Sequence, residues 1–195
     1  MDASFHFLEH FSDQKLIYGI NLTLDGCCDH TKGTGGDDIH EYFAALLEQA
    51  DQVIYGRKTY ELMVPFWPEV ARAQSMDKAS NRFALVFDKL EKLVFSRTLT
   101  SVDDRNSRLL HGDLQEEVLK LKQQPGKAIS TGGVDLPGQL IALGLVDEFH
   151  VVVHPVIAGE GRRLFDDLKL QETLGLKLME INKLDGGRVA LHYVR

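Results

Sequence analysis

Three short segments of this sequence combine residue types that bind phosphate. Each directly follows an apolar run: "GRKT" (56–59) follows "QVIY", "SRT" (96–98) follows "KLVF", and "TGG" (131–133) follows "KAIS". Arginine binds phosphate oxygens through two parallel hydrogen bonds, and hydroxyl groups donate to the remaining oxygens. A glycine pair before a helix lets the backbone approach an anion, and the helix adds free N–H groups. Together, the segments predict a site for a ligand with several phosphates, such as a dinucleotide.

Each segment has a simpler interpretation when it is taken alone. Arg57 and Arg97 would then be surface cations, and the glycine pair at 132–133 would be a tight turn. Their position at strand ends favours a site, because ligands of open α/β sheets bind outside the carboxyl ends of the strands. The common G-x-G-x-x-G fingerprint is missing, as is the acid expected about twenty residues later. Arginines in its place favour a ligand with an additional phosphate, which indicates NADPH rather than NADH.

The composition is that of an ordinary globular protein and argues against several functions. The chain has 195 residues, of which 44% are hydrophobic, and a formal net charge of −7. An acidic chain without a long basic run is a poor partner for nucleic acid. No apolar run approaches the roughly 20 residues that span a bilayer, and the N-terminus lacks the features of a signal peptide, so a cytoplasmic location without membrane contact is expected. Cys27 and Cys28 are adjacent, which is typical of free thiols rather than of a disulfide or a metal site.

The order of the apolar segments predicts an α/β fold. Strands are expected at 15–24, 52–56, 83–87, 92–96, 127–131 and 148–157, helices at 38–50, 113–124 and 134–144, and a helical turn at 58–63. The turn residues "DGG" (185–187) predict a C-terminal hairpin. This alternation predicts one domain with a mostly parallel central sheet that is covered on both faces and ends in an antiparallel edge. The least ordered parts are expected at 1–14, 30–38 and 100–108.

The motifs, taken in order along the chain, resemble the dihydrofolate reductase fold. They are "INLTLDG", "GRKTYE", "FSRTL", "ISTGGVDL" and "DEFHVVVHPVIAGEGRRLF". The resemblance is to the RibD C-terminal branch in particular, the reductase domain of riboflavin biosynthesis, and it runs from about Lys15 to the C-terminus. It implies a three-layer α/β/α domain, a stand-alone NADPH-dependent reductase of the 5-amino-6-(5-phosphoribosylamino)uracil reductase type, and a homodimer. The deaminase motif of the bifunctional enzyme, His-x-Glu with a later Pro-Cys-x-x-Cys, is missing from the sequence.

The resemblance implies cofactor contacts at all three phosphate-binding segments. Arg57 and Thr59 are similar to the family's contacts to the 2′-phosphate and the pyrophosphate. Ser96 and Arg97 are similar to its contacts on the adenosine side, and Leu22 lies on the strand that passes under the nicotinamide. The full implied set is Leu22, Thr23, Gly56, Arg57, Lys58, Thr59, Ser96, Arg97, Thr131, Gly132, Gly133, Val134 and Leu136.

On the substrate side, the resemblance implies a proton donor and several wall residues. The carboxylate of dihydrofolate reductases matches Asp38, with Asp37 as an equal alternative, although Asp38 and Glu41 also form the pattern of a helix capping box. His154 is a second candidate for a catalytic proton donor, or else a strand histidine that is bonded to a backbone carbonyl. A water molecule is a third source. The implied substrate-binding residues are Asp25, at the start of a mobile loop, Tyr42, and Trp67, which is alternatively a packed loop anchor.

These observations predict an NADPH-dependent reductase that transfers a hydride to a small conjugated heterocycle of the pyrimidine or pterin type. A non-catalytic dinucleotide-binding module of the same fold is the main alternative, and a transferase that binds a mononucleotide or a phosphosugar is another. An enzyme requires an open pocket at the nicotinamide end, whereas a binding module can fill it with side chains. The predicted pocket residues are Leu22, Thr23, Tyr42, Trp67 and His154.

Overall fold

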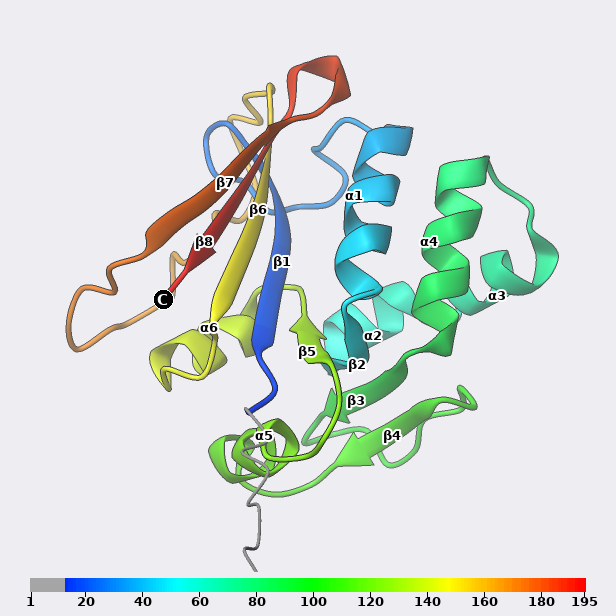
Figure 1. Cartoon of the computed structure of the whole chain (residues 1–195), viewed down its shortest axis with the longest axis vertical. Coiled ribbons are helices and arrows are strands. Elements are labelled where there is room, and N and C mark those ends of the chain that lie inside the picture. Colours follow the sequence, from blue (N-terminus) through cyan, green and yellow to red (C-terminus); the bar gives the residue numbers. More distant parts are fainter. Residues whose placement is uncertain (1–12) are drawn as a thin grey trace, which may run out of the picture.

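A computed structural model describes residues 13–195 of the chain (Figure 1). The loosely ordered N-terminus was predicted over 1–14, and residues 1–12 of it lie outside the described residues. The strands are β1 (Leu16–Thr23), β2 (Ala50–Gly56), β3 (Glu91–Phe95), β4 (Ser107–Leu110), β5 (Ala128–Thr131), β6 (Glu148–His154), β7 (Lys177–Lys183) and β8 (Val189–Val194). The helices are α1 (Asp37–Leu47), α2 (Arg57–Met63), α3 (Phe66–Ala73), α4 (Lys78–Lys89), α5 (Leu114–Lys122) and α6 (Asp135–Ala142), with a 3-10 turn, η1 (Asp185–Gly187).

All of these strands belong to one sheet, in the order β4-β3-β2-β5-β1-β6-β8-β7. The neighbours from β4 to β6 pair in parallel. β8 pairs antiparallel with both β6 and β7, which closes the sheet with a hairpin. The predicted mostly parallel sheet with an antiparallel C-terminal hairpin is therefore confirmed. One consequence matters for the site: the carboxyl ends of β1, β2 and β5 meet at the same edge.

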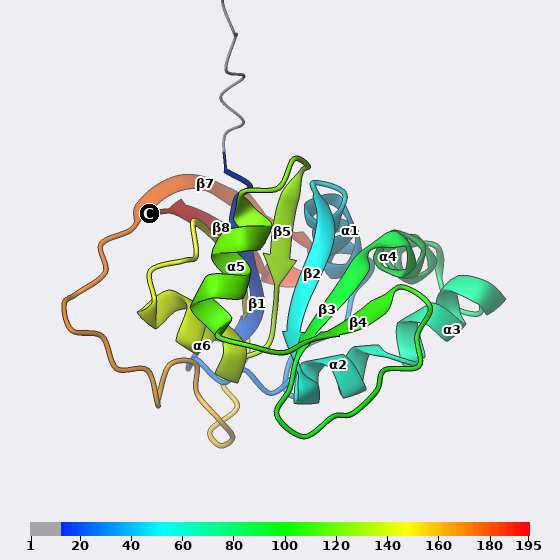
Figure 2. The ribbon, with the colours of Figure 1, turned by 90° about the horizontal axis from the view of Figure 1, so that it is seen from below.

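Helices cover both faces of the sheet, as predicted (Figures 1 and 2). One apolar cluster joins the sheet to α5 and α6, and a second joins the other face to α1 and α4. Because side chains alternate along a strand, β2 and β3 contribute buried residues to both clusters. The first cluster includes Leu16, Tyr18, Leu93, Val118 and Leu140, and the second includes Ala44, Val53, Phe83, Phe87 and Val94.

Residues 83–87 were predicted to form a strand, and this prediction is wrong because they lie in α4. Asp77 begins the helix, since its side chain accepts a hydrogen bond from a backbone N–H three residues later at 2.8 Å. Phe83 and Phe87 lie one helical turn apart and are both buried, whereas Leu85 between them is 43% exposed. A five-residue apolar run does not distinguish a strand from a helix, so the helix cap was the informative signal.

Two elements were not predicted, and two predicted helix ends are confirmed. α3 follows α2 directly, and β4 begins at the end of the segment 100–108, which was expected to be among the least ordered parts. The Asp113 side chain accepts a hydrogen bond from the Glu116 N–H at 3.0 Å, as its capping pattern predicted. Gly144, with a φ of 70°, follows the end of α6. No helix within residues 13–195 is long and apolar enough to cross a membrane.

Candidate functional site

A cleft of about 940 Å³ opens at the carboxyl edge of the parallel strands. The ends of β1, β2 and β5 border it, together with residues of α1 to α4 and the first turn of α6. This is where ligands of open α/β sheets bind. The predicted site residues that line the cleft are Leu22, Thr23, Gly56, Arg57, Lys58, Thr59, Trp67, Thr131, Gly132, Gly133, Val134, Leu136 and His154.

The first and third phosphate-binding segments are in direct contact. Thr59 lies in the first turn of α2, and Gly133 precedes α6. Gly133 has a φ of 87°, which glycine adopts without strain. A Cβ at this position would lie 2.2 Å from Thr59 Oγ1, so only glycine permits the approach. The Tyr18 hydroxyl donates a hydrogen bond to the Gly133 carbonyl oxygen at 2.8 Å, which fixes the turn from the sheet side.

Two threonine hydroxyls at the bottom of the cleft are already used inside the protein. Thr131 donates to the Ile54 carbonyl oxygen at 2.8 Å and so joins β5 to β2. Thr23 donates to the Asp25 carboxylate at 2.6 Å and accepts from the Cys27 N–H at 2.9 Å. These hydroxyls therefore hold the strand ends in place.

The cations of the cleft gather around the starts of α2 and α6, which we call the cationic end (Arg57, Lys58 and Arg162). Arg57 Nη1 lies 3.0 Å from the Glu61 carboxylate. Arg162 Nη1 and Lys58 Nζ lie 2.6 Å and 3.7 Å from the Asp135 carboxylate. All five side chains are at least 40% exposed. Exposed pairs contribute only about 0–1 kcal/mol, so a phosphate can displace these carboxylates.

The second predicted segment lies beside the cleft and not in it. The pairing of β2 with β3 places residues 96–98 next to the start of α2. The Ser96 hydroxyl oxygen accepts hydrogen bonds from the backbone N–H groups of Thr98 and Leu99, at 3.1 Å and 3.0 Å, which closes a turn. Neither Ser96 nor Arg97 lines the cleft. Their contacts to adenosine stay a prediction.

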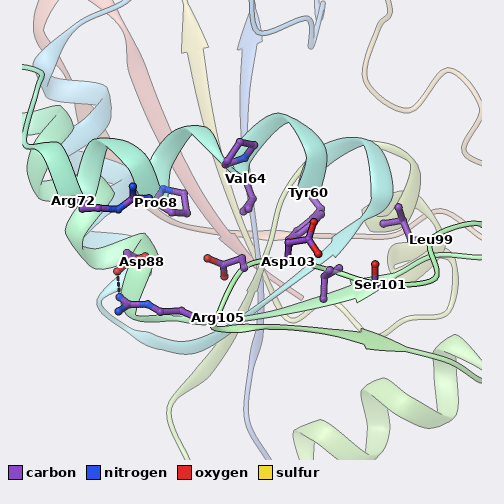
Figure 3. A pocket seen from close by; sticks show the side chains of 12 residues that line it. Tyr60, Val64, Pro68, Arg72, Asp88, Leu99, Ser101, Asp103 and Arg105 are labelled. Atoms are coloured by element: carbon purple, nitrogen blue, oxygen red, sulfur yellow. Dashed lines mark hydrogen bonds and ion pairs between the residues drawn. The ribbon is translucent and has the colours of Figure 1, made fainter.

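A second hollow, of about 700 Å³, lies between α2, α3 and the chain that follows this turn (Figure 3). Its rim carries both acidic and basic groups, and Arg105 forms an ion pair with Asp88. Tyr60 of α2 faces this hollow, whereas Arg57 and Thr59 of the same helix face the cleft. α2 therefore separates the two, and no predicted site residue lines the second hollow.

Aromatic and aliphatic side chains line the other end of the cleft. This apolar end consists of Ile39, Phe43, Leu47, Phe66, Trp67 and Phe83. The Trp67 ring stands edge-on to Phe83, with ring centroids 4.6 Å apart, and to Phe66, with centroids 5.0 Å apart. Phe66 is 50% exposed. Trp67 thus forms part of the cleft wall, and it belongs to the helix α3 rather than to a loop.

Asp38 does not reach the cleft, so its assignment as the catalytic acid is corrected. Arg188 Nη1 lies 3.1 Å from both of its carboxylate oxygens. Arg188 also donates to the carbonyl oxygens of Thr34, Gly35 and Asp185. The capping box is wrong as well, because the first turn of α1 receives no side-chain cap. Asp38 instead fastens the start of α1 to the turn of the β7–β8 hairpin.

Tyr42 points away from the cleft, so its assignment as a substrate wall is also corrected. Its hydroxyl lies 2.8 Å from His150 Nδ1, on the side of α1 that faces β6 and β8. The His150 ring stacks on His192 with centroids 4.1 Å apart, and His192 Nε2 lies 3.1 Å from the Glu148 carboxylate. Tyr42 therefore belongs to a polar cluster behind α1.

Asp25, assigned to the substrate, fastens the loop in which it lies. Its carboxylate accepts hydrogen bonds from the Thr23 hydroxyl at 2.6 Å and from the N–H groups of Ala158 and Gly159, both at 3.0 Å. These bonds hold the pKa of Asp25 well below its usual range. Asp25 does not line the cleft. It joins the loop after β1 to the segment that follows β6.

His154 lines the cleft, but both of its ring nitrogens are occupied. Nδ1 accepts from the Thr34 N–H at 3.1 Å, so Nε2 carries the proton and donates to Asn21 Oδ1 at 3.1 Å. Burial, followed by the nearby Arg188 guanidinium, lowers the pKa of His154. The ring is only 3% exposed. This arrangement fits a structural histidine rather than a proton donor, although its partners differ from the predicted backbone carbonyl.

His40 is a cleft residue that the sequence analysis missed. The Ser80 hydroxyl donates to Asp77 Oδ2 at 2.6 Å, and its oxygen lies 2.9 Å from His40 Nδ1. The Ser80 oxygen therefore accepts a hydrogen bond from the His40 Nδ1–H group, and Nε2 is left without a partner within residues 13–195. The available signal was the spacing of His40, Phe43 and Leu47, which puts them on one face of α1. Arg162 was also missed, because its contact with α6 depends on the fold.

Comparisons with known proteins place these features in a family. The profile of the RibD C-terminal domain matches residues 14–190. The chain is 34% identical over 191 residues to YyaP, an uncharacterized protein of Bacillus subtilis (strain 168), with 94% of this chain and 96% of that protein covered. It is 27% identical to a second uncharacterized protein of the same organism, YwjB, over 94% of this chain and 99% of that protein.

Solved structures show the same fold at low sequence identity. A putative riboflavin biosynthesis protein from Shewanella sp. PV-4 superposes with a TM-score of 0.72 at 20% identity, covering 93% of this chain and 99% of that chain. A diaminohydroxyphosphoribosylaminopyrimidine deaminase/5-amino-6-(5-phosphoribosylamino)uracil reductase from Thermotoga maritima superposes with a TM-score of 0.65 at 14% identity. The match covers 93% of this chain but 56% of that chain, so this chain spans little more than half of the bifunctional protein.

The contact between Gly133 and Thr59 generates a prediction. Gly133→Ala places a methyl group on Thr59 Oγ1 at a positive φ, and we expect it to lower the free energy of unfolding by about 1–3 kcal/mol. Gly138→Ala is the matched control, because this helical glycine has nothing within 4 Å of an added Cβ. It should raise stability by about 0.5–1 kcal/mol. Urea denaturation measures both, and equal effects would contradict the close approach.

Proposed function

The chain belongs to the RibD C-terminal domain family, which confirms the resemblance of its motifs. On that premise, we propose that it is an NADPH-dependent reductase of a small conjugated heterocycle. One observation carries the proposal. The cleft joins an end with cations and a glycine turn, suited to phosphates, to an apolar end suited to a ring. Phe66 at the apolar end is 50% exposed, and the cleft of about 940 Å³ leaves room for a ring beside these side chains.

The residues at the cationic end fit a dinucleotide with an additional phosphate. Gly133 leaves the start of α6 without a Cβ, so the first N–H groups of the helix are accessible to an anion. Arg57 and Lys58 begin α2, next to that turn, and offer charged donors for further phosphates. When bound, NADPH supplies a hydride to a C=N or C=O group of the substrate, and a proton completes the reduction.

His40 is the group that we propose supplies the proton. The other two candidates, Asp38 and His154, use their polar atoms on protein partners. Imidazole gives and takes protons readily near neutral pH. Ser80 and Asp77 hold the ring at Nδ1, so Nε2 is the atom that exchanges a proton with a substrate.

Cofactor preference tests the proposal. Arg57→Ala removes a charge-assisted contact worth about 1.5–3 kcal/mol, so we expect NADPH binding to weaken about 10-fold to 100-fold, while NADH binding changes less than about 2-fold. Fluorescence titration measures both. Arg108→Ala is the matched control, because Arg108 is a similarly exposed arginine, at 47% against 43%, paired with a glutamate outside the cleft. If the ratio of the NADPH affinity to the NADH affinity is the same in Arg57→Ala as in the wild type, Arg57 does not bind the 2′-phosphate.

The proton donor generates a second prediction. His40→Ala should lower kcat about 10²-fold to 10⁴-fold and leave the dissociation constant of NADPH unchanged, because the side chain lies at the apolar end. Added imidazole should restore part of the rate. His111→Ala, at an exposed histidine outside the cleft, is the control. Rates would be followed by NADPH oxidation with pterins and ribosylaminopyrimidines, and loss of NADPH binding in His40→Ala would assign the residue to the cofactor instead.

The same experiments distinguish the alternative functions. A non-catalytic dinucleotide-binding module would bind NADPH and oxidise it with none of the substrates offered. A mononucleotide or phosphosugar transferase would be saturated by AMP-like fragments as readily as by NADPH.

We also propose a homodimer that forms at the β7 edge of the sheet. β7 is the last strand, and its Leu178, Met179 and Ile181 side chains are 45%, 52% and 59% exposed. Exposed apolar side chains on an edge strand favour association. We expect sedimentation velocity to give about twice the mass of the chain. In Ile181→Lys, we expect the measured mass to fall toward that of a single chain. A wild-type chain that sediments as one copy at micromolar concentration would reject the interface.

A further inference from the structure

We infer that the substrate is a planar, uncharged ring system that carries no phosphate group. This inference rests on the proposed function and narrows its substrate class. The resemblance alone implies a phosphoribosylated pyrimidine, which has a dianionic end. The chemistry of the apolar end does not suit such a group.

The distribution of cations within the cleft is the first argument. Within residues 13–195, the lysine and arginine residues that line the cleft are Arg57, Lys58 and Arg162. All of them lie at the cationic end, and Lys58 and Arg162 share the carboxylate of Asp135 at the start of α6. Residues 1–12 contain neither lysine nor arginine. Within the described residues, the apolar end therefore has no lysine or arginine to pair with a phosphate.

The cations that lie nearest to α1 are committed elsewhere. Arg82 pairs with two glutamates, Glu41 and Glu48. Both carboxylate oxygens of Glu48 lie 3.0 Å from Arg82 Nη2. Arg188 is 5% exposed and pairs with Asp38. Neither arginine lines the cleft. Turning either one toward a substrate phosphate would break ion pairs and, for Arg188, would leave a buried carboxylate without its partner.

The walls of the apolar end are the second argument. Phe66, Trp67 and Phe83 form a chain of edge-on contacts, and half of the Phe66 side chain is open to solvent. Aromatic rings pack well against a flat conjugated ring, either face-on or edge-on. Burying a phosphate against them without a partner is unfavourable, because its charge loses hydration and gains no hydrogen bond.

His40 is the polar contact that remains for the ring. Its Nε2 is free within the described residues, whereas the Asn21 amide oxygen is bonded to His154. One free nitrogen in an apolar wall can fix the orientation of a ring through a single heteroatom, as in many small-molecule sites. The apolar end thus selects for the shape of the ring and for one hydrogen bond, and His40 is the one group there that could contact a dianion.

A matched pair of ligands tests the inference. The probes are a ribosylaminopyrimidine, its 5′-phosphate, and pterin as a second uncharged ring. Their binding to the full chain saturated with NADP⁺ would be measured by calorimetry. We expect the uncharged compounds to bind and the 5′-phosphate to bind at least about 10-fold more weakly than its parent, because its dianion finds no lysine or arginine among the described residues of the apolar end. Equal or tighter binding of the 5′-phosphate would overturn the inference, as would the absence of binding by all three probes.

A change of charge gives an independent readout. Phe66→Arg places a cation at the exposed rim of the apolar end, and we expect it to strengthen binding of the 5′-phosphate about 10-fold relative to the parent compound. Leu85→Arg is the control, because this residue is 43% exposed on α4 and does not line the cleft. An equal response in both variants would overturn the inference, since the phosphate would then not lie at the apolar end.

A prior titration with NADPH separates this inference from the proposed function. If NADPH does not bind, the proposed function fails and the inference fails with it. If NADPH binds and the 5′-phosphate is nevertheless the preferred ligand, only the substrate class is wrong.

Discussion

The contact between Gly133 and Thr59 is the constraint on which the cleft depends. α2 follows β2, and α6 follows β5, and these strands are parallel neighbours, so both helices begin at the same edge of the sheet. A side chain at position 133 would push the two helix starts apart. The Tyr18 hydroxyl holds the glycine turn from below. A parallel sheet is required for this arrangement, because antiparallel neighbours would send the two helices to opposite edges.

Local ion pairs explain how an acidic chain can keep a site for anions. The net charge of −7 would repel a phosphate at long range, but salt screens charges beyond roughly 10 Å. The charged groups nearest to the site therefore determine its affinity for an anion more than the net charge does. Without a ligand, Glu61 and Asp135 partly neutralise the cations of the cationic end, and these pairs are exposed enough to open at small cost. In the proposed function, a ligand with several phosphates would replace these carboxylates as the partner of Arg57 and Lys58 and would also contact the start of α6.

The sequence predicted those features that depend on local pattern and missed those that depend on distant partners. Strand ends followed by "GRKT" and "TGG" are local, and the structure brings both into the cleft. By the family resemblance, Asp38 was assigned as the catalytic acid, and Tyr42 and Asp25 were assigned to the substrate. Each is instead bonded to a residue more than a hundred positions away, which no local pattern reveals. His40 was missed because its anchor, Ser80, lies on α4, a helix that was not predicted and whose residues 83–87 were expected to form a strand.

The positions of Asp38 and His40 link the proton donor to the substrate class. Neighbouring residues on a helix face different directions, so α1 turns Asp38 toward Arg188 and His40 toward the cleft. A carboxylate in the cleft would be ionised after giving up its proton and would favour a cationic ring. In the proposed function, His40 is a cation only while Nε2 and Nδ1 both carry a proton, and it is neutral once the Nε2 proton has been given up. The aromatic walls and the absence of a lysine or arginine among the described residues of this end both favour an uncharged ring.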